Sequence, residues 1–517
     1  MPTLFLINPK QRYANYYAQT ELSRILKKKR FMVPLAIPTV AALTPPHYAI
    51  RIIDEEVEAL PESELPDIVG ITTLAATILR VYEIADHYRS RGVKVVLGGA
   101  YASYMTEEAL QHADAVVVGE AEGLWEQCLH DFESACMKSV YRNDTYCDFS
   151  RSPVPRWDLL PADAFFQVGV QVSRGCPYSC EFCLVHKLFG RKMRYREIDN
   201  VIAELKALPV RKVFFIDDNL TVNRRYAREL MERIKPLHLA WSCMASIDIA
   251  NDEELLKAMA EAGCFNILIG FESLNPESLQ ETNKKHNKSA LIYKEAVQKI
   301  HARGIHITAS FAVGFDHDTA DEFDKIIDFT SQTGLSYINL NILGAPPGSE
   351  LYDRLNREGR WYGISPDYRS GLFPCMHYQK MSQTELFEAY FTAIQEAYDW
   401  KNITAKAKVL FRPGHFSAPY NDHQRDAAFQ FRASILLLRH FAWSRNRHKR
   451  KLFFYLLWLI LRRKTAIDKA ASYMLSMMSY HNHIAHMVKN IDVYRDIVRR
   501  HDQGKWEDLV KTSFKAG

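Results

Sequence analysis

Short apolar runs alternate with amphipathic stretches along most of the first 375 residues of the chain. Among residues 1–135 the pattern predicts a helix near Leu79–Arg91 and strands at Thr3–Ile7, Ile68–Thr72, Val93–Leu97 and Ala115–Val118. Short strands separated by helical patterns form parallel sheets with helices on both faces. We therefore predict a doubly wound α/β domain over residues 1–135 and a linker over residues 136–165.

The same alternation continues in six strand-and-helix units between residues 166 and 375. Val168, Val170 and Val172 alternate as the first strand, which we expect to be half buried. Later strands are predicted at Val213–Ile216, Leu239–Ala245, Phe265–Ile269, Ile307–Val313 and Tyr337–Ile342, with helices near Arg224–Ile234, Asp252–Ala262, Ser289–Ala302 and Thr319–Thr333. Such a series predicts a parallel sheet curled into a partial (β/α)6 barrel, whose chemistry gathers at the carboxyl ends of the strands.

Residues 376–517 show mainly helical patterns and predict a basic, helical C-terminal domain. Between Ala427 and Ile467 there are ten Lys or Arg residues and no acidic residue. The apolar run Leu452–Leu461 is ten residues long, too short to cross a bilayer of about 30 Å at about 1.5 Å per residue. Flanked by cations, it is typical of a helix lying on an anionic membrane surface. A core helix with a solvated basic face is the alternative.

Composition adds bounds to this picture. The chain has 517 residues, of which 47% are hydrophobic and 25% charged, as in ordinary globular proteins of several domains. Nine cysteines, three of them clustered, do not form a disulfide framework, so we expect the reducing cytoplasm. The start, Met1–Pro9, lacks a basic leader and a cleavage site and predicts a short buried strand rather than a signal peptide.

Three cysteines, Cys176, Cys180 and Cys183, fall in eight residues directly after the first barrel strand. Cubane iron–sulfur clusters normally take four thiolates, so three leave one iron open to a substrate or cofactor. His186 follows at the spacing of a Cys₃His zinc site, which is a competing hypothesis. The setting favours the cluster, because zinc knuckles usually lie in small hairpins rather than at the head of a long α/β unit.

Acids and glycines follow three of the later barrel strands. Asp217, Asp218 and Asn219 end the second strand, Gly270–Ser273 end the fourth, and Gly314–Asp316 end the fifth. Because these strand ends share the edge that carries the cysteines, we expect a polar site there. A helix N-cap or a solvated loop residue is the alternative for each of these side chains, most of all for Asn219 and Asp316.

The run RGCPYSCEFC resembles the CxxxCxxC loop of the radical S-adenosylmethionine (SAM) superfamily, including an aromatic residue, Phe182, before the last cysteine. The resemblance implies that Cys176, Cys180 and Cys183 hold a [4Fe–4S] cluster and that SAM chelates the open iron. One electron would then cleave SAM to a 5′-deoxyadenosyl radical that abstracts hydrogen from unactivated C–H bonds. A reducing donor such as flavodoxin or ferredoxin is the implied partner.

The same resemblance assigns SAM contacts to the strand ends. Asp217 and Asp218 would face the ammonium group, Glu272 the ribose, and Gly314 the adenine. Gly270 and Phe182 complete the predicted SAM-binding residues. Glycine at such a position lets the ligand approach the backbone closely.

Residues 1–135 resemble a cobalamin-binding domain. Thr72 and Leu74 match its Ser/Thr-x-Leu segment, and a glycine pair follows about 25 residues later, at a spacing like that of the family. The predicted cobalamin contacts are Thr72, Leu74, Gly98, Gly99, Gly119 and Glu120. The family's DxHxxG loop is absent, and His87 is interpreted as an ordinary helix residue. Many cobalamin-dependent radical SAM proteins also lack this loop, so cobalamin stays the prediction; a degenerate domain retained for its fold is the alternative.

The resemblance covers about residues 1–375, including Ala345–Ser349, which resembles the TPxPGT segment of cobalamin-type members. It implies a class B radical SAM methyltransferase. The substrate carbon would be unactivated, in a hydrophobic molecule such as a lipid, an isoprenoid or a tetrapyrrole. A rearrangement, cyclisation or oxidation is the alternative reaction. Methylthiolation is disfavoured because that group carries a second cysteine set, and no cysteine precedes Cys128 here.

Two hypotheses from other classes stay open at this point. One is a cobalamin-binding sensor with a structural zinc site. The other is a basic nucleic-acid-binding scaffold, which the small net charge of +5 and the long apolar run disfavour. We expect a cytoplasmic protein with peripheral contact to the membrane and a small hydrophobic substrate.

Overall fold

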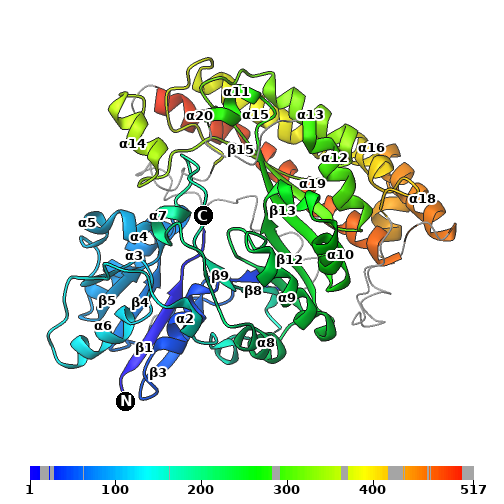
Figure 1. Ribbon diagram of the computed structural model, residues 1–517. Helices are drawn as coiled ribbons and strands as arrows, with labels where there is room; N and C mark the ends of the chain where they lie inside the picture. Colours follow the sequence, from blue (N-terminus) through cyan, green and yellow to red (C-terminus); the bar gives the residue numbers. More distant parts are fainter. Residues whose placement is uncertain are drawn as a thin grey trace.

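The computed structural model describes residues 1–11, 23, 28–61, 63–161, 163–281, 291–362, 371–416, 435, 437–462, 465 and 467–502. Figure 1 shows a blue and cyan lobe that contains the first sheet, beside a green lobe built on the second. Orange and red helices lie outside the green lobe. The short helix α7 (Val185–Leu188), which follows the cysteines in the sequence, lies where the two lobes meet.

The first sheet has six parallel strands in the order β3-β1-β4-β5-β6-β7. Their bounds are β1 Thr3–Asn8, β3 Ala49–Asp54, β4 Ile68–Thr72, β5 Lys94–Gly98, β6 Ala115–Val118 and β7 Val140–Arg142. One face packs on α3 (Ile78–Arg89) and the other on α2 (Ala36–Leu43) and α6 (Leu124–Glu133). The doubly wound prediction is confirmed, and β3 and β7 are strands that the sequence pattern did not reveal.

The strand order reverses between β1 and β4, because the chain adds β3 on one side of β1 and all later strands on the other. Ligands of open α/β sheets bind at such a reversal, outside the carboxyl ends of the strands. The segment after Thr72, which ends β4, lies at this point. His87 lies exposed on α3 as an ordinary helix residue.

The second sheet has seven parallel strands in the order β15-β14-β13-β12-β11-β8-β2. Six follow the chain in sequence: β8 Phe165–Val170, β11 Lys212–Phe215, β12 Ala240–Ala245, β13 Cys264–Glu272, β14 His306–Val313 and β15 Tyr337–Ile342. This is the predicted partial barrel. The seventh, β2 (Arg30–Val33), comes from the N-terminal part of the chain and pairs with β8. The first barrel strand ends at Val170, before the buried Val172.

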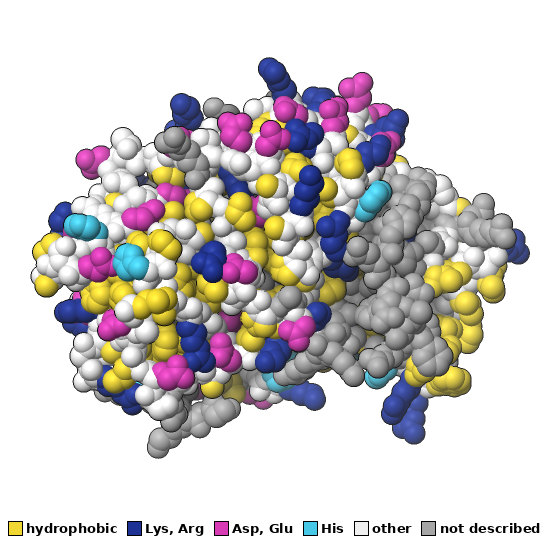
Figure 2. Space-filling view, turned by 90° about the horizontal axis from the view of Figure 1, so that it is seen from below, with side chains coloured by type: hydrophobic (Ala, Val, Ile, Leu, Met, Phe, Trp, Pro, Cys, Tyr) yellow, Lys and Arg dark blue, Asp and Glu magenta, His cyan; other side chains and the backbone are white. Residues whose placement is uncertain are grey.

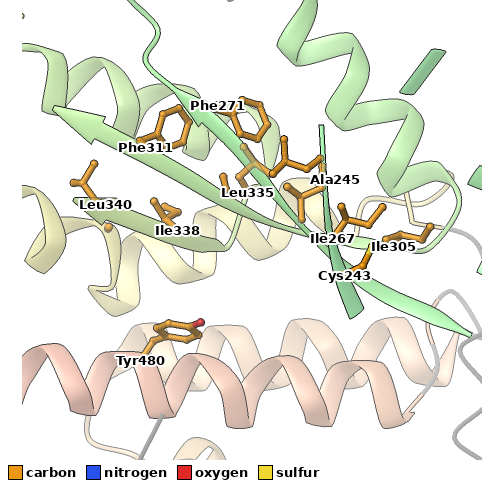
Figure 3. Packing of buried hydrophobic residues seen from close by; sticks show 14 of the residues in the cluster. Cys243, Ala245, Ile267, Phe271, Ile305, Phe311, Leu335, Ile338, Leu340 and Tyr480 are labelled. Atoms are coloured by element: carbon orange, nitrogen blue, oxygen red, sulfur yellow. The ribbon is translucent and has the colours of Figure 1, made fainter. Parts of the chain in front are cut away.

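Helices cover the outer face of the barrel sheet: α8 Ile198–Ala207, α9 Arg224–Ile234, α10 Glu253–Glu261, α12 Leu291–Ala302 and α13 Glu322–Thr333. Figure 3 shows buried side chains of neighbouring strands, such as Ile267, Phe271 and Phe311, pointing toward one another. The Phe271 and Phe311 rings stack with centroids 5.3 Å apart. The expected start of α12 at Ser289 lies outside the described residues.

The C-terminal part is helical, as predicted: α15 Gln383–Ala397, α16 Trp400–Leu410, α18 Arg447–Leu461, α19 Ile467–Lys489 and α20 Ile491–Asp502. It covers β15, the edge of the barrel sheet. The Ile338 N–H donates to the Tyr398 hydroxyl at 2.9 Å, and that hydroxyl donates to the Ile338 carbonyl at 2.8 Å. Such coverage blocks further strand pairing at the edge. Within the described residues, no helix is both long and apolar enough to span a membrane.

Candidate active site

The cysteine loop, residues 175–184, follows β8 in the chain. It is held by two short paired strands, which we call the frame of the cysteine loop. Two short strands, β9 (Ser173–Arg174) and β10 (Arg194–Tyr195), pair in antiparallel fashion on either side of it. The Cys176 N–H donates to the Gly190 carbonyl at 3.1 Å, and Cys183 N–H to the Cys180 carbonyl at 3.0 Å. Gly175 has φ +97°, and a Cβ there would lie 2.5 Å from the Lys192 carbonyl oxygen. The loop entry therefore requires glycine.

Asp217 holds the entry to this loop. Its fully buried carboxylate accepts hydrogen bonds from the Val172 N–H at 3.1 Å and the Ser173 hydroxyl at 2.6 Å, and also from the Ser173 N–H. Burial raises its pKa to about 7, although these donors favour the ionised form. The structure thus gives Asp217 a part in fixing the backbone before the cysteines. Its predicted contact with the SAM ammonium stays a prediction.

Asp218 and Glu272 lie near the last cysteine. Burial, with a smaller contribution from the negative charges of Asp218, Cys176 and Glu272, raises the pKa of the Cys183 thiol to about 11. Burial also raises the pKa of Asp218 to about 6. The ends of β11 and β13 therefore lie beside the cysteine loop, as expected for parallel strands that share one edge of a sheet.

Glu272 has a left-handed backbone, with φ +65°, which is uncommon for a residue with a side chain. The register of β13 on β14 shifts there, since Gly270 pairs with Ser310 and Glu272 with Phe311. This bulge ends the strand and leaves Phe271 in the core. Strained backbone of this kind is retained where the surrounding structure demands it, commonly at functional sites.

The end of β14 is built around Gly314, which has φ +123°. A Cβ there would lie 2.7 Å from Cε1 of the Tyr378 ring. The buried Asp318 carboxylate accepts from the Gly314 and Phe315 N–H groups at 2.9 and 3.1 Å. The Phe315 ring meets that of Phe182 edge to face, with centroids 6.3 Å apart. Phe182 and Gly314, both predicted SAM contacts, are thus brought close together.

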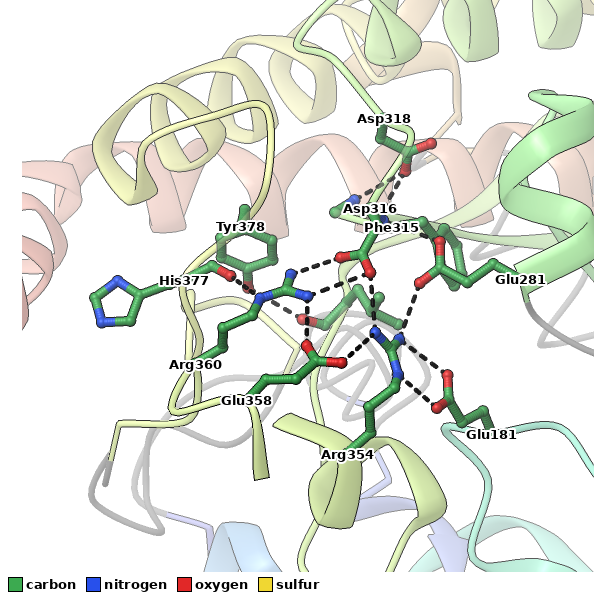
Figure 4. A network of polar contacts seen from close by, with 12 residues as sticks. Glu181, Glu281, Phe315, Asp316, Asp318, Arg354, Glu358, Arg360, His377 and Tyr378 are labelled. Carbon is green, nitrogen blue, oxygen red and sulfur yellow. Dashed lines mark hydrogen bonds and ion pairs between the residues drawn. The ribbon is translucent and has the colours of Figure 1, made fainter. Parts of the chain in front are cut away.

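Arg354 ties the cysteine loop to the segments that follow β13 and β14, and no motif in the sequence pointed to it. It lies on α14 (Glu350–Arg357), and its guanidinium donates to both carboxylate oxygens of Glu181, at 2.7 and 3.0 Å. It also reaches Glu281 at 3.1 Å and Asp316 at 2.9 Å. Figure 4 shows these carboxylates converging on it. Bidentate pairs with arginine are the strongest of such contacts and fix geometry.

The interpretation of Asp316 as a solvated loop residue is not what the structure shows. Its carboxylate bridges Arg354 and Arg360, whose Nη2 donates at 2.5 Å, and these cations lower the Asp316 pKa against the opposing effect of burial. The backbone of α14 adds a further link, since Leu351 N–H donates to the Glu181 carbonyl at 2.9 Å.

In the first sheet, the predicted cobalamin contacts follow the carboxyl ends of β4, β5 and β6. Leu74 is 51% exposed. Thr73, which the sequence did not single out, is buried; its hydroxyl donates to the Gly98 carbonyl at 2.8 Å and accepts from Ala102 N–H at 2.9 Å. Gly99 has φ +102°, and a Cβ there would lie 2.9 Å from the Thr73 carbonyl oxygen. The Thr72 hydroxyl is also close to Gly99, since it would lie 3.2 Å from a Cβ there.

Gly119 differs from Gly99 in having open space in front of it. It has φ +85°, and a Cβ there would meet nothing within 4 Å. Its N–H donates to the Ser103 hydroxyl at 2.9 Å. A bulky ligand can therefore approach this backbone, as expected at the edge of a cofactor site.

Glu120 joins the first domain to the two short strands beside the cysteine loop. Its carboxylate pairs with Arg174 of β9 at 3.0 Å and with Arg194 of β10 at 2.9 Å, and accepts from Cys147 N–H at 2.9 Å. Burial raises the Glu120 pKa, but the two guanidinium groups outweigh it and the pKa is lowered. The frame of the cysteine loop is thus anchored on the first domain. A contact of Glu120 with cobalamin stays a prediction.

Tyr104 brings the first domain against the cysteine loop itself. It ends α4 (Ala100–Tyr104), the helix that begins directly after Gly99, and its hydroxyl donates to the Leu184 carbonyl at 3.2 Å. A Cβ at Gly348 would lie 2.3 Å from the Tyr104 ring. Burial raises the Tyr104 pKa and the negative charge of Cys183 adds to the shift. The glycine-rich strand ends and the cysteines therefore border one region.

His186 lies against α14. Its side chain is buried, and its Nε2 lies 3.4 Å from Glu350 of α14. Among the described residues, no group of three or more His, Cys, Asp or Glu side chains is arranged around a single metal ion.

Three family models match the chain. The B12 binding domain matches residues 23–129, the radical SAM superfamily matches residues 170–330, and a domain of unknown function (DUF4070) matches residues 349–494. The third begins at the residue before α14, so Arg354 belongs to it.

Relatives of similar length are known. Bacteriochlorophyllide d C-12(1)-methyltransferase of Chlorobaculum tepidum is 28% identical over 397 residues, which are 74% of this chain and 86% of the relative. Hopanoid C-2 methylase of Rhodopseudomonas palustris is 28% identical over 435 residues, 80% of each chain.

Two solved structures share the fold. The cobalamin-dependent SAM radical enzyme OxsB, with aqua-cobalamin and SAM bound, matches with a TM-score of 0.60 at 14% identity, over 99% of this chain and 84% of OxsB. The radical SAM methyltransferase TsrM from Kitasatospora setae matches with a TM-score of 0.58 at 13% identity, over 86% of this chain and all of TsrM.

The residues at the two sites fit the cofactors that these domains bring, namely a [4Fe–4S] cluster, SAM and cobalamin. Three thiols on one rigid loop are the soft donor set that iron–sulfur clusters take. Gly119, a positive-φ glycine directly after β6, leaves backbone accessible to a ligand at the carboxyl edge of the first sheet. The chain is therefore a member of the radical SAM superfamily that carries a B12-binding domain ahead of its radical SAM domain.

Proposed function

We propose that this protein is a cobalamin-dependent radical SAM methyltransferase that acts on an unactivated carbon of a hydrophobic small molecule. One observation carries the proposal: Tyr104, six residues after Gly98, contacts the backbone of the cysteine loop. Methyl transfer by two cofactors requires both to reach one substrate, and this contact supports a cobalamin site and a cluster site that border one space.

When bound, the cluster and SAM supply a 5′-deoxyadenosyl radical, and cobalamin supplies the methyl group. The chain's own residues orient and enclose them. Cys176, Cys180 and Cys183 would hold the cluster, while Asp218 and Glu272 contribute negative charge beside Cys183. Phe182 and Phe315 add apolar surface beside the loop, where their rings meet edge to face.

The substrate class is inferred from relatives. The named products of two of them are a methylated bacteriochlorophyllide and a methylated hopanoid, a tetrapyrrole and a polycyclic isoprenoid. Both are large and apolar. We propose a lipid, isoprenoid or tetrapyrrole substrate for this chain.

A cyclisation is the second candidate. Anaerobic magnesium-protoporphyrin IX monomethyl ester cyclase of Rubrivivax gelatinosus is 26% identical over 333 residues, 56% of this chain. A relative of this chain is therefore named for ring formation rather than for methyl transfer. Products of the reaction with SAM separate the two, because methyl transfer consumes SAM to S-adenosylhomocysteine and cyclisation does not.

The decisive experiment is anaerobic reconstitution with iron, sulfide and hydroxocobalamin, followed by SAM and dithionite. The expected protein holds about four irons per chain and forms 5′-deoxyadenosine. Cys183→Ala should abolish both, while Cys136→Ala, at an exposed cysteine, should keep both. Zinc in place of iron, or no 5′-deoxyadenosine from the intact chain, would refute the proposal.

We propose further that the protein works in the cytoplasm, receives electrons from a flavodoxin or ferredoxin and contacts the membrane peripherally. An apolar substrate supports the last point, because such molecules partition into bilayers.

A further inference from the structure

Helix α18 has two apolar faces, although only one of them packs on the protein. Leu452, Leu456 and Leu459 are fully buried against the helical layer that includes α16. On the opposite side Phe454 is 55% exposed, Trp458 46% and Leu461 75%. Large apolar side chains exposed in a continuous row are rare on proteins that interact with nothing.

The exposed residues share one face with cations. Arg447, Lys451, Phe454, Trp458 and Leu461 follow one another at intervals of four, three, four and three residues, which at about 3.6 residues per turn keeps them in one row. We call this row the outer face of α18. Two cations stand at its N-terminal end. Arg462 stands at the other end, with its guanidinium 5.3 Å from the centre of the Trp458 ring.

A groove runs beside the first turns of the helix. Its lining consists of four cations and two aromatic side chains: Lys408, Arg447, Arg450, Lys451, Phe454 and Tyr455. No acidic residue occurs in the sequence from Ala427 to Ile467 to neutralise them. Three of the ten cations in that stretch, Arg432, Arg463 and Lys464, lie outside the described residues.

The apolar area extends beyond α18. Trp443, which follows the π-helix Leu438–Ala442, is 75% exposed, and that π-helix packs against α18. Figure 2 shows hydrophobic side chains gathered beside Lys and Arg at the right-hand end of the molecule, where α18 lies in Figure 1. Since α18 packs on α16 and α16 on α13, α18 forms the outer layer on its side of the barrel among the described helices.

We propose that the outer face of α18 docks on an anionic lipid bilayer, with Phe454, Trp458 and Leu461 in the headgroup region and the flanking cations on lipid phosphates. This rests on the peripheral membrane contact of the proposed function and names the element responsible. A helix with aromatic and aliphatic residues on one side and cations at its ends has the composition of an interfacial helix.

The charge and the apolar residues of the outer face of α18 disfavour two other partners, a second copy of this chain and a nucleic acid. A second copy paired about a two-fold axis would bring this basic face against itself, without an acid in the stretch to neutralise it. Nucleic acid would satisfy the cations and leave Trp458 and Leu461 against a phosphate backbone. An anionic bilayer satisfies both kinds of side chain.

The apolar part is tested by co-sedimentation of the full chain with vesicles of phosphatidylcholine, with and without phosphatidylglycerol. We expect binding to the anionic vesicles, and a loss of more than about tenfold in the triple variant Phe454→Ser, Trp458→Ser, Leu461→Ser. Because these side chains are exposed, the variant should fold. The matched control is Leu65→Ser with Val493→Ser, two residues exposed to a similar degree elsewhere.

The cationic part is tested by Arg447→Gln with Lys451→Gln, which should weaken binding about fivefold per removed cation at low salt and less at high salt. Lys206→Gln with Lys257→Gln is the control, at exposed sites on α8 and α10.

Four results would overturn the proposal. Two concern vesicles: the intact chain does not sediment with anionic vesicles, or the triple variant binds them as well as the intact chain does. The other two point to a different partner: polyuridylate displaces the protein from vesicles at matched salt, or light scattering shows that the intact chain is a dimer and the triple variant a monomer. Formation of 5′-deoxyadenosine from SAM is measured in parallel. A chain that binds vesicles but cleaves no SAM refutes the proposed function alone, and one that cleaves SAM but binds no vesicles refutes the docking alone.

Discussion

At the residue scale, carboxylates after strand ends do two different jobs in this protein. Asp217 and Glu120 are buried and engaged by backbone N–H groups or guanidinium groups, so they fix the frame of the cysteine loop. Asp218 and Glu272 instead contribute charge beside Cys183. The sequence pattern is the same in both cases, an acid directly after an apolar run. The pattern therefore does not show which partner the carboxylate will meet.

Arg354 is expected to be a positioning residue for the cluster. In Arg354→Gln, the half-buried carboxylates of Glu181, Glu281 and Asp316 lose their shared cation, so the loop between Cys180 and Cys183 should loosen. We expect iron loss to a chelator several-fold faster and an altered electron paramagnetic resonance spectrum of the reduced cluster. Arg354→Lys should rescue only in part, because lysine cannot bind bidentately.

Arg357→Gln is the control for this prediction. It lies on the same helix, is exposed, and its Nε donates to the Asp353 carbonyl at 3.3 Å rather than to the cysteine loop. Equal iron loss from Arg354→Gln and Arg357→Gln would show that the network does not hold the loop.

Glu272 is expected to strain the backbone of the folded chain and to contribute to SAM binding. Glycine accepts the φ of +65° without strain, so Glu272→Gly should leave the free energy of unfolding unchanged or raise it by up to about 1 kcal/mol after the entropy cost of glycine. Loss of the carboxylate should weaken SAM binding about tenfold or more, measured by equilibrium dialysis. Glu272→Gln should weaken SAM binding with no gain in stability. Full SAM affinity in both variants would remove Glu272 from the SAM site.

At the scale of elements, β9, β10 and α14 matter because they hold a loop that has little regular structure of its own. β9 and β10 contribute Arg174 and Arg194 to Glu120 of the first domain. α14 contributes Arg354 from the other side. The cysteine loop is thus clamped by charges from both neighbouring domains.

Glu120→Ala should release the first of these clamps. Arg174 keeps its contact with Glu122 at 2.8 Å, whereas Arg194 loses its carboxylate while nearly buried. A loss of about 2–3 kcal/mol in the local opening free energy is expected. Hydrogen exchange should report it, with faster exchange of the Cys176 amide.

The matched control is Glu58→Ala, which removes a surface pair with Arg51 in the same domain. Exposed pairs contribute about 0–1 kcal/mol, so exchange at Cys176 should not change. The prediction fails if both variants leave that amide equally protected.

Lys406 on α16 should make stability depend on pH. It is buried, its Nζ donates to the Ala397 carbonyl at 2.5 Å, and burial lowers its pKa to about 7. Between that value and the unfolded value of 10.5 the unfolded chain binds the proton that the folded chain has released. Stability from this group therefore rises with pH above 7, by about 2 kcal/mol between pH 7 and 9.

Calorimetry of the intact chain and of Lys406→Met checks this slope. The midpoint of the intact chain should rise relative to that of the variant as the pH goes from 7 to 9. A constant difference across this range would mean that Lys406 keeps its ordinary pKa.

At the scale of the whole molecule, two sheets with different topologies are set together so that their carboxyl edges border one region. The doubly wound sheet offers the strand reversal between β1 and β4, and the barrel offers the cysteine loop and the ends of β11, β13 and β14. β2 also links the N-terminal part of the chain to the barrel, because it pairs with β8, the barrel strand that precedes the cysteines.

Cobalamin should stabilise the first domain by linkage. At a hundredfold excess of hydroxocobalamin over its Kd, the gain is about 2.7 kcal/mol, seen as a higher midpoint of the first unfolding transition. Gly119→Ala should reduce this gain, because the added methyl group meets no protein atom and would obstruct the ligand, while the strain of alanine at φ +85° is the same with and without cobalamin. Gly92→Ala is the control, with φ +82° and the same open surroundings at the end of α3. Equal gains in the two variants would place cobalamin elsewhere.

The sequence by itself determined the two α/β patterns, the helical C-terminal part and the cysteine loop with its neighbouring strand ends. These follow from local rules, since apolar periodicity selects strands and helices, and parallel strands bring their carboxyl ends to one edge. The tertiary structure decided the partners across long separations: Glu120 with Arg174 and Arg194, and Glu181 with Arg354, which is 173 residues away. It also decided which side of α18 faces outward. Such pairings depend on how elements pack, and no local pattern along the chain encodes them.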